Sequence, residues 1–306
     1  MKLKHLVSWL LIGVALLGAG VKLLDTAQQT GSSSVAKAQA KDDQQAVLTQ
    51  AKTAAVKSQQ TAATTKTTLQ ETLLAQWQAI LDQTSSRVDI AIYLPERQQT
   101  IQLSNDATTS THATASIIKA TILTQVLHQA EQQGTALTTA ESEQATEMIE
   151  NSSNDAATYF LQTILGGYGA TDQLFSALAM TDSSADTEAW GLTQTTASDQ
   201  LKLLNTIFYN SAYLSTADQA YIQSLMGQVS AEQSWGVSTG SASWQLKNGW
   251  LTDEGNTMIN SIGHVTTTGG NDYTIAVLTD QNESEATGQA LIGQLAQATA
   301  TVIDQN

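Results

Sequence analysis

The folded part of the chain is built around residues 116–134, which read SIIKATILTQVLHQAEQQG. Apolar side chains recur there at helical spacing and Gly134 ends the pattern, which predicts a largely buried helix that begins at Ser116. Lys119 lies three residues further on, so its amine projects from the same face as the serine hydroxyl. A serine hydroxyl is a poor nucleophile alone, and a desolvated lysine can act as its base. Ser116 and Lys119 are therefore a candidate catalytic pair.

The Ser-x-x-Lys pattern by itself is a weak signal. The same pattern occurs at Ser34 and Lys37, inside a polar stretch with the composition of a linker. The weight given to Ser116 and Lys119 therefore depends on the residues that accompany them.

A second polar group lies at residues 151–154, Asn-Ser-Ser-Asn, between two predicted helices. Ser and Asn are favoured in helix caps and turns, and a structural cap is enough to explain them. The alternative is functional, because Ser152 and Asn154 stand two residues apart on a tight link. They would then present a hydroxyl and an amide to a cleft.

A third group is Lys-Asn-Gly-Trp at residues 247–250, on a strand that we place in the centre of a sheet. A lysine there is unfavourable unless its charge is used, whereas on an edge strand, or with its stem reaching to solvent, it needs no function. Residues 76–306 contain only five basic side chains, and Lys119 and Lys247 are two of them. That scarcity favours a functional role for both.

Composition excludes several kinds of site. The 306 residues include no cysteine, which rules out disulfides, thiolate metal sites and a cysteine nucleophile. The four histidines show no metal-ligand spacing, so we predict neither a metal nor another cofactor. The formal net charge is −15, and residues 76–306, with five basic and 24 acidic side chains, carry −19. Such a field disfavours nucleic acid and anionic lipid as partners of this part.

Residues 1–25 have the pattern of an export segment, with lysines before an apolar run from Leu6 to Val21. The run lies in length between a signal-peptide core and a minimal membrane span. We favour an uncleaved membrane anchor with the rest of the chain outside; a cleaved signal peptide, giving a secreted protein, is the alternative. Residues 26–70 form a low-complexity spacer, and residues 71–306 form the folded domain on the extracellular face.

Hydrophobic periodicity predicts a mixed α/β (α+β) domain with two lobes. The expected elements are a helix over 69–82, strands over 88–94 and 100–103, an all-helical insertion between 116 and 226, strands over 244–250, 257–267 and 273–278, and a last helix over 285–303. This order suggests one antiparallel sheet of about five strands, with the terminal helices on one face and the helical lobe on the other. The candidate residues would meet in the cleft between the lobes.

Taken together, Ser116-x-x-Lys119, Ser152-x-Asn154 and Lys247-Asn248-Gly249 resemble three signatures of the penicillin-recognising serine enzymes, S-x-x-K, S-D-N and K-T-G. That superfamily holds the class A β-lactamases and the penicillin-binding proteins. The resemblance covers about residues 72–304 and implies a β-lactamase/transpeptidase-like fold. A third signature of the form Lys-Asn-Gly-Trp is typical of exported β-lactamase-related serine hydrolases.

The resemblance also implies a role for each matching residue. Ser116 would be the acylated nucleophile, Lys119 its base, and Ser152 the relay of a proton to the leaving group. The substrate-side residues would be Asn154, which binds an amide, Lys247, which supplies positive potential, and Asn248, Gly249 and Trp250 on the strand. The oxyanion hole would be formed by the backbone N–H groups of Ser116 and Trp250.

The sequence departs from the class A pattern in two places. Asn248 stands where a Thr or Ser hydroxyl normally holds a substrate carboxylate. The loop between residues 179 and 195 is too short for the usual ω loop, and Glu188 is its only glutamate. Because the family's glutamate positions the water that releases the acyl-enzyme, we expect slow deacylation.

Three interpretations of function follow from these features. The first is an exported serine hydrolase or acyl-transferase that acts on a β-lactam, a peptidoglycan-like peptide or a related amide or ester. The second is a true class A-like β-lactamase, and the third is a non-catalytic binding module at the cell surface. We expect a monomer in each case.

Overall fold

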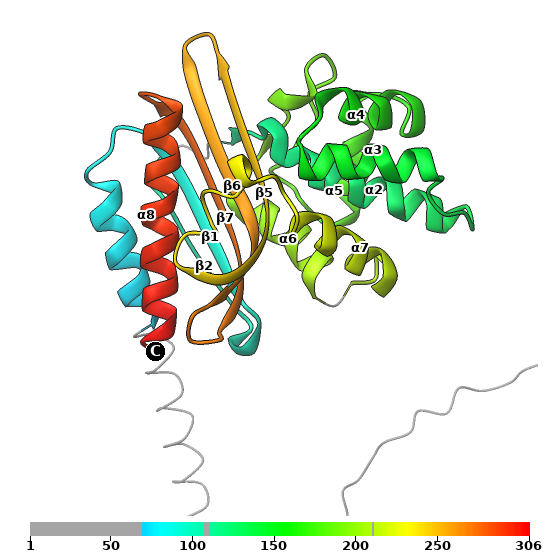
Figure 1. Ribbon diagram of the computed structural model, residues 1–306. Helices are drawn as coiled ribbons and strands as arrows, with labels where there is room; N and C mark the ends of the chain where they lie inside the picture. Colours follow the sequence, from blue (N-terminus) through cyan, green and yellow to red (C-terminus); the bar gives the residue numbers. More distant parts are fainter. Residues whose placement is uncertain (1–68, 107–110, 210) are drawn as a thin grey trace, which may run out of the picture. The chain divides into compact units, whose positions relative to one another are not determined.

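The computed structural model describes residues 69–106, 111–209 and 211–306, which form a five-stranded antiparallel sheet with helices on both faces (Figure 1). The predicted membrane anchor and nearly all of the predicted spacer lie outside these residues. Within the described ranges, no helix has the length and apolar character needed to cross a membrane.

The sheet is assembled from the two ends of the domain, as the sequence predicts. Its order is β2-β1-β7-β6-β5, and each pair of neighbours is antiparallel. The strands are β1 (Arg87–Leu94), β2 (Gln99–Ser104), β5 (Ser241–Asp253), β6 (Asn256–Thr267) and β7 (Asp272–Asn282). A separate two-residue pair, β3 (His112–Ala113) with β4 (Gln194–Thr195), was not predicted, because two residues are too short for a periodic pattern.

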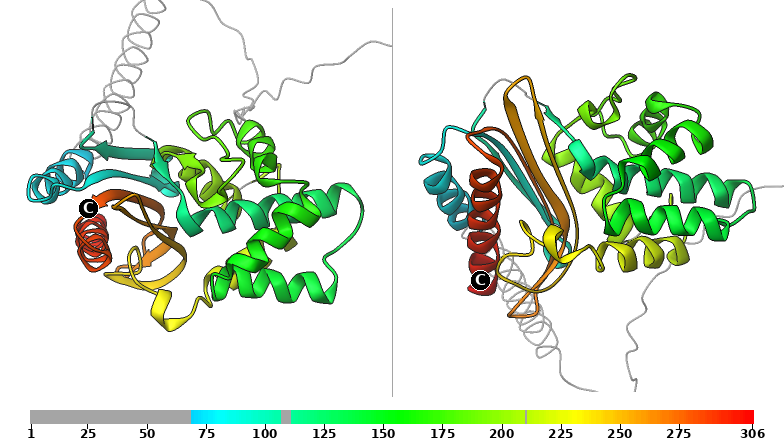
Figure 2. Two further views of the ribbon diagram at one scale, coloured as in Figure 1. Left: turned by 90° about the horizontal axis from the view of Figure 1, so that it is seen from above. Right: turned by 45° about the horizontal axis from the view of Figure 1, so that its top comes forward.

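One face of the sheet is covered by the terminal helices. The helix over residues 69–81 and α8 (Glu285–Asp304) lie on the same side of the sheet in both views of Figure 2. Alternate residues of the strands, such as Val88 and Ile90, point into this core. The buried indole N–H of Trp77 donates to the Thr299 hydroxyl at 2.9 Å, which joins the two helices.

The helical lobe packs on the other face. It contains α2 (Ile118–Gln132), α3 (Thr139–Glu150), α4 (Asn154–Tyr159), α5 (Asp172–Ala177), α6 (Ala197–Phe208) and α7 (Thr216–Met226). Residues of the opposite alternation, Ala91, Ala276 and Leu278, join its core. Helix starts follow local chemistry, because α3, α4, α6, α7 and α8 each follow a Ser or Thr whose side chain accepts a backbone N–H.

The helix that follows Ser116 begins with a tight turn. Ser116 lies in a 3-10 turn, Ala115–Ile117, that leads directly into α2. The first ten residues of α2, from Ile118 to Leu127, are all buried. Ala115 has φ +46, a left-handed conformation that costs a non-glycine residue about 1–3 kcal/mol. The predicted buried helix is thus confirmed, and strain is stored just before the candidate nucleophile.

The central position predicted for the strand of Lys247 is wrong. β5 is the edge strand of the sheet, next to β6 alone. Lys247 is nevertheless fully buried, because the turn that carries Ser116 lies against the face of β5 to which Lys247 and Gly249 point. β5 therefore has a neighbouring strand on one side only, yet its Lys247 side chain is shielded from solvent.

Candidate active site

The sequence-predicted polar residues meet at the seam between sheet and helical lobe. The Lys119 Nζ lies 2.8 Å from the Ser116 Oγ and 3.1 Å from the Ser152 Oγ. The Lys247 Nζ lies 2.9 Å from the same Ser152 Oγ. A continuous chain of hydrogen bonds therefore runs from one serine through a lysine to the second serine and the second lysine.

The link at residues 151–154 has both of the roles considered for it. Ser153 caps α4 by accepting the Ala156 N–H, which leaves Ser152 and Asn154 to face Lys119. The Lys119 Nζ donates to the Ser152 carbonyl and to the Asn154 Oδ1, both at 2.7 Å. Ser152 adopts φ +56, and this left-handed backbone turns its carbonyl and its hydroxyl toward the same amine.

Burial sets the charge state of the two lysines. Both side chains are fully buried, and burial lowers the pKa of Lys119 to about 7. Burial first, and then the charge of Lys119, lower the pKa of Lys247 well below its ordinary value. Four oxygens surround the Lys119 amine. In its neutral form, which burial favours, this amine has a lone pair that can accept the Ser116 O–H.

Gly249 allows β5 to approach the nucleophile turn. A Cβ built on this glycine would lie 2.6 Å from the Ser116 nitrogen, 2.8 Å from the Ile117 nitrogen and 2.9 Å from the Thr114 oxygen. All three atoms belong to the backbone and cannot move cheaply, so only glycine fits here. The contact places the backbone N–H of Ser116 beside β5, where the oxyanion hole is expected.

Asn260 holds the same turn from β6, a role that the sequence analysis did not assign. Its fully buried side chain donates to the Ala113 carbonyl at 2.8 Å and the Thr114 carbonyl at 3.1 Å, and it accepts the Thr279 N–H at 3.1 Å. The segment before Ser116 is thereby fixed to the sheet. A buried asparagine in the middle of an apolar strand was the available signal for this role.

Asn248 and Trp250 lie on the same strand but in different surroundings. By strand alternation the Asn248 side chain points away from the face of Lys247 and Gly249, and its nitrogen donates to the carbonyls of Gln233 at 2.8 Å and Trp235 at 2.9 Å. A substrate contact by this amide stays a prediction and would require those bonds to open. Trp250 is 38% exposed, and its ring centroid lies 6.1 Å from that of Trp235.

The loop between residues 179 and 195 puts a tryptophan over Lys119. Trp190 begins a 3-10 turn, Trp190–Leu192, and its ring centroid lies 5.1 Å from the Lys119 Nζ. A cavity of about 370 Å³ is lined by Trp190 together with Asn154, Glu188 and Leu251. Sequence reasoning missed Trp190, since it stands in a polar loop without periodicity.

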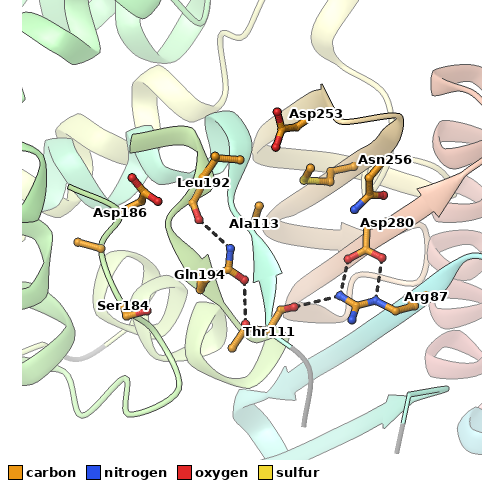
Figure 3. Close-up of a pocket in the computed structure, with 12 residues that line it drawn as sticks. Arg87, Thr111, Ala113, Ser184, Asp186, Leu192, Gln194, Asp253, Asn256 and Asp280 are labelled. Atoms are coloured by element: carbon orange, nitrogen blue, oxygen red, sulfur yellow. Dashed lines mark hydrogen bonds and ion pairs between the residues drawn. The ribbon is translucent and has the colours of Figure 1, made fainter. Parts of the chain in front are cut away.

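A second cavity, of about 410 Å³, shares Leu192 and Asp253 with the first one. Arg87 lines this second cavity, and Figure 3 shows its guanidinium facing the Asp280 carboxylate. The Arg87 Nε donates to Oδ1 at 2.8 Å and Nη2 donates to Oδ2 at 2.5 Å. The His112 Nδ1 lies 3.0 Å from the same carboxylate. Among residues 69–106, 111–209 and 211–306, no group of three His, Asp or Glu side chains is arranged to hold a metal ion.

This fold, with a Ser–Lys–Ser–Lys cluster between its two lobes, defines a protein of the penicillin-recognising serine enzyme superfamily. More specifically, residues 141–303 match the beta-lactamase enzyme family, and the chain belongs to that family. The matched range begins after Ser116 and Lys119, so the placement of those two residues rests on the geometry above.

Solved structures of class A β-lactamases share the fold. A representative from Bacteroides cellulosilyticus is 17% identical, with a TM-score of 0.67, over 78% of this chain and 99% of that chain. The extended-spectrum β-lactamase TLA-1 is 18% identical, with a TM-score of 0.67, over 76% of this chain and 98% of that chain. A variant of PBP-A, in an acyl-enzyme complex with penicillin G, is 17% identical, with a TM-score of 0.65, over 78% of this chain and 97% of that chain. A search of curated proteins gave no significant match.

Proposed function

We propose that the protein is a serine hydrolase or acyl-transferase that forms an acyl-enzyme at Ser116. The observation that carries this proposal is the 2.8 Å contact between the Ser116 hydroxyl and the fully buried amine of Lys119. With its pKa near 7, this amine is half neutral at neutral pH and can accept the serine proton.

The reaction can be followed along the chain of hydrogen bonds. The Ser116 Oγ attacks the substrate carbonyl carbon while its proton passes to the Lys119 Nζ. The Ser152 hydroxyl, 3.1 Å from that nitrogen, then relays a proton to the leaving group as the scissile bond breaks. Lys247 lies 2.9 Å from the Ser152 Oγ and, in its protonated form, supplies positive potential to the developing charge. The backbone N–H groups of Ser116 and Trp250 would bind the oxyanion.

The substrate is proposed to be a β-lactam, a cell-wall peptide or a related amide or ester. The side chain of Asn154 is exposed and accepts from Lys119 through its oxygen, which leaves its NH₂ group for a substrate carbonyl. Within the described residues 69–106, 111–209 and 211–306, each Lys or Arg outside the Ser–Lys cluster already has a partner. Arg87 pairs with Asp280, Lys202 pairs with Asp199 at 2.7 Å, and Arg97 donates to the Asn306 carbonyl at 3.0 Å.

Slow deacylation is part of the proposal. An aromatic ring, rather than a carboxylate, lies against Lys119 on the side of the shortened loop. This arrangement supports an acyl-enzyme that persists in water and is resolved by another acceptor. We further propose that the domain is exported and works as a monomer on the extracellular face, anchored by residues 1–25 or secreted if that segment is cleaved.

A true β-lactamase is the second candidate, and one observation favours it. Glu188 lines the same cavity as Asn154 and Trp190, and its side chain is exposed to that space. Rapid multiple-turnover hydrolysis of a penicillin, lost in Glu188→Gln, would make Glu188 the deacylation base and would contradict slow release.

The test is the intact mass of the purified protein after incubation with penicillin G and, separately, with an activated serine-hydrolase probe. We expect a persistent adduct that is absent in Ser116→Ala. Reaction with the probe alone would keep the hydrolase and move the substrate away from D-alanyl peptides. Absence of an adduct with either reagent would reject the proposed function in favour of a binding module.

A further inference from the structure

Trp190 is held rigidly beside the nucleophile turn. Just before it, the Asp186 carboxylate accepts the N–H groups of Glu188 at 2.8 Å and Ala189 at 2.7 Å. Just after it, the Thr193 carbonyl accepts the Thr114 N–H at 2.8 Å, two residues ahead of Ser116. The loop is therefore fixed at both ends, and one end is fixed to the segment that carries the nucleophile.

The indole ring is fixed as well. Its N–H donates to the Thr158 hydroxyl of α4 at 3.3 Å, and the ring packs against the core of the helical lobe. The Lys119 Nζ stands over the ring face, 5.1 Å from the centroid, within the range of a cation–π contact. Trp190 thus has a defined position relative to the base.

The surroundings of the Lys119 amine leave no direction open to water. The Lys119 side chain is fully buried, and oxygens of Ser116, Ser152 and Asn154 lie within hydrogen-bond distance of its amine. The indole ring lies over the same amine. A water molecule can reach this amine only by displacing one of these oxygens or the ring.

We propose that Trp190 is a positioning residue that keeps hydrolytic water away from the acylated Ser116, so that the acyl group is transferred to an amine instead. This inference rests on the proposed function, and it specifies an amine as the acceptor that removes the acyl group from Ser116. Two nucleophiles compete for the ester carbonyl carbon on Ser116. Water would attack it, give its proton to Lys119 and release a carboxylic acid as the C–Oγ bond breaks and Oγ regains a proton.

An amine acceptor reaches the same carbon by another route. Its nitrogen forms the new C–N bond, its proton passes through the Ser152 hydroxyl toward Lys119, and the Ser116 Oγ leaves with a proton to give an amide. Ser152 lies between the two lysines, 3.1 Å from one Nζ and 2.9 Å from the other, so this relay does not require the ring to move.

The experiment uses the full chain, acylated with penicillin G or p-nitrophenyl acetate, with and without glycinamide as the amine. Adduct lifetime and the ratio of amide to acid products are measured for the wild type, Trp190→Ala and Trp190→Phe. We expect Trp190→Ala to shorten the lifetime in buffer by about tenfold to a hundredfold and to shift products toward the acid. Trp190→Phe, which keeps a ring over Lys119, should stay within about twofold of the wild type.

Two further variants separate this role from general damage. Tyr168→Ala opens the same cavity, but its hydroxyl contacts Gln162 and not the base, so the lifetime should not change. Thr158→Val removes the acceptor of the indole N–H and should give an adduct lifetime between those of the wild type and Trp190→Ala. It replaces Trp190→Ala as the test if that variant does not fold. An adduct on Ser116 whose lifetime is the same in all variants would overturn this inference alone. No adduct in the wild type would overturn the proposed function with it.

Discussion

At the residue scale, the charge on Lys119 controls the proposed acylation. The amine must be neutral to take the Ser116 proton, and burial lowers its pKa to about 7. The neutral fraction grows as the pH rises, so the acylation rate should increase about tenfold per pH unit below 7 and level off above it. Stopped-flow acylation by an activated ester between pH 5 and 9 measures this profile. A rate that is flat across pH 7 would contradict Lys119 as the base.

Lys119→Arg is the matched variant for this prediction. The guanidinium keeps the charge and a similar length but does not lose its proton in proteins. We expect the acylation rate to fall by about 10²–10⁴ and the inflection near pH 7 to disappear. Retention of that inflection in Lys119→Arg would assign it to Lys247, whose pKa is lowered as well.

At the scale of elements, the distance between β5 and the nucleophile turn depends on Gly249. In Gly249→Ala the new Cβ would meet the Ser116 nitrogen at 2.6 Å, so the strand and the turn must separate. Loss of one oxyanion donor costs about 10²–10³ in rate, and we expect acylation to fall by that factor while the domain stays folded. Gly293→Ala is the control. It lies on α8, where a Cβ would meet only the Thr239 side chain, at 3.3 Å, and acylation should be unchanged.

Local patterns in the sequence were enough to predict most helices and strands, but not the order of the strands in the sheet. The 3.6-residue period and the cap residues gave the helices, and alternation gave β1, β6 and β7. The central position expected for β5 was wrong, because strand order is fixed by pairings between residues far apart in the chain. The motif spacing brought Ser116, Lys119, Ser152 and Lys247 together correctly. It said nothing of Trp190, whose position depends on the fold of an aperiodic loop.

The same limit explains Asn248. Asn248 follows Lys247 in the motif, and the predicted substrate contact of Asn248 was based on this position in the sequence. Adjacent residues of a strand point to opposite faces, and the structure buries the Asn248 amide against two main-chain carbonyls. Knowing which face meets the helical lobe requires the tertiary structure.

At the scale of the whole molecule, the net charge of −19 over residues 76–306 acts on any charged substrate. An anionic substrate must enter this field before it reaches Lys119 and Lys247, and salt weakens the repulsion over a Debye length of about 10 Å at 0.1 M. We expect kcat/KM for a carboxylate-bearing ester probe to rise about two- to fivefold between 20 and 300 mM NaCl. The methyl ester of the same probe, which is neutral, should show no salt dependence.

The acids that create this effect should be those at the cleft. Asp253 lines both cavities next to the site, so Asp253→Asn should speed the anionic probe at low salt and flatten its salt dependence. Glu131→Gln removes the same charge near the far end of α2, about 18 Å from Lys119 along the helix axis, and should change the salt dependence much less. A fall in kcat/KM for the anionic probe with added salt would contradict the expected repulsion. The two buried lysines would then outweigh the field of the domain, and the site would recognise a carboxylate after all.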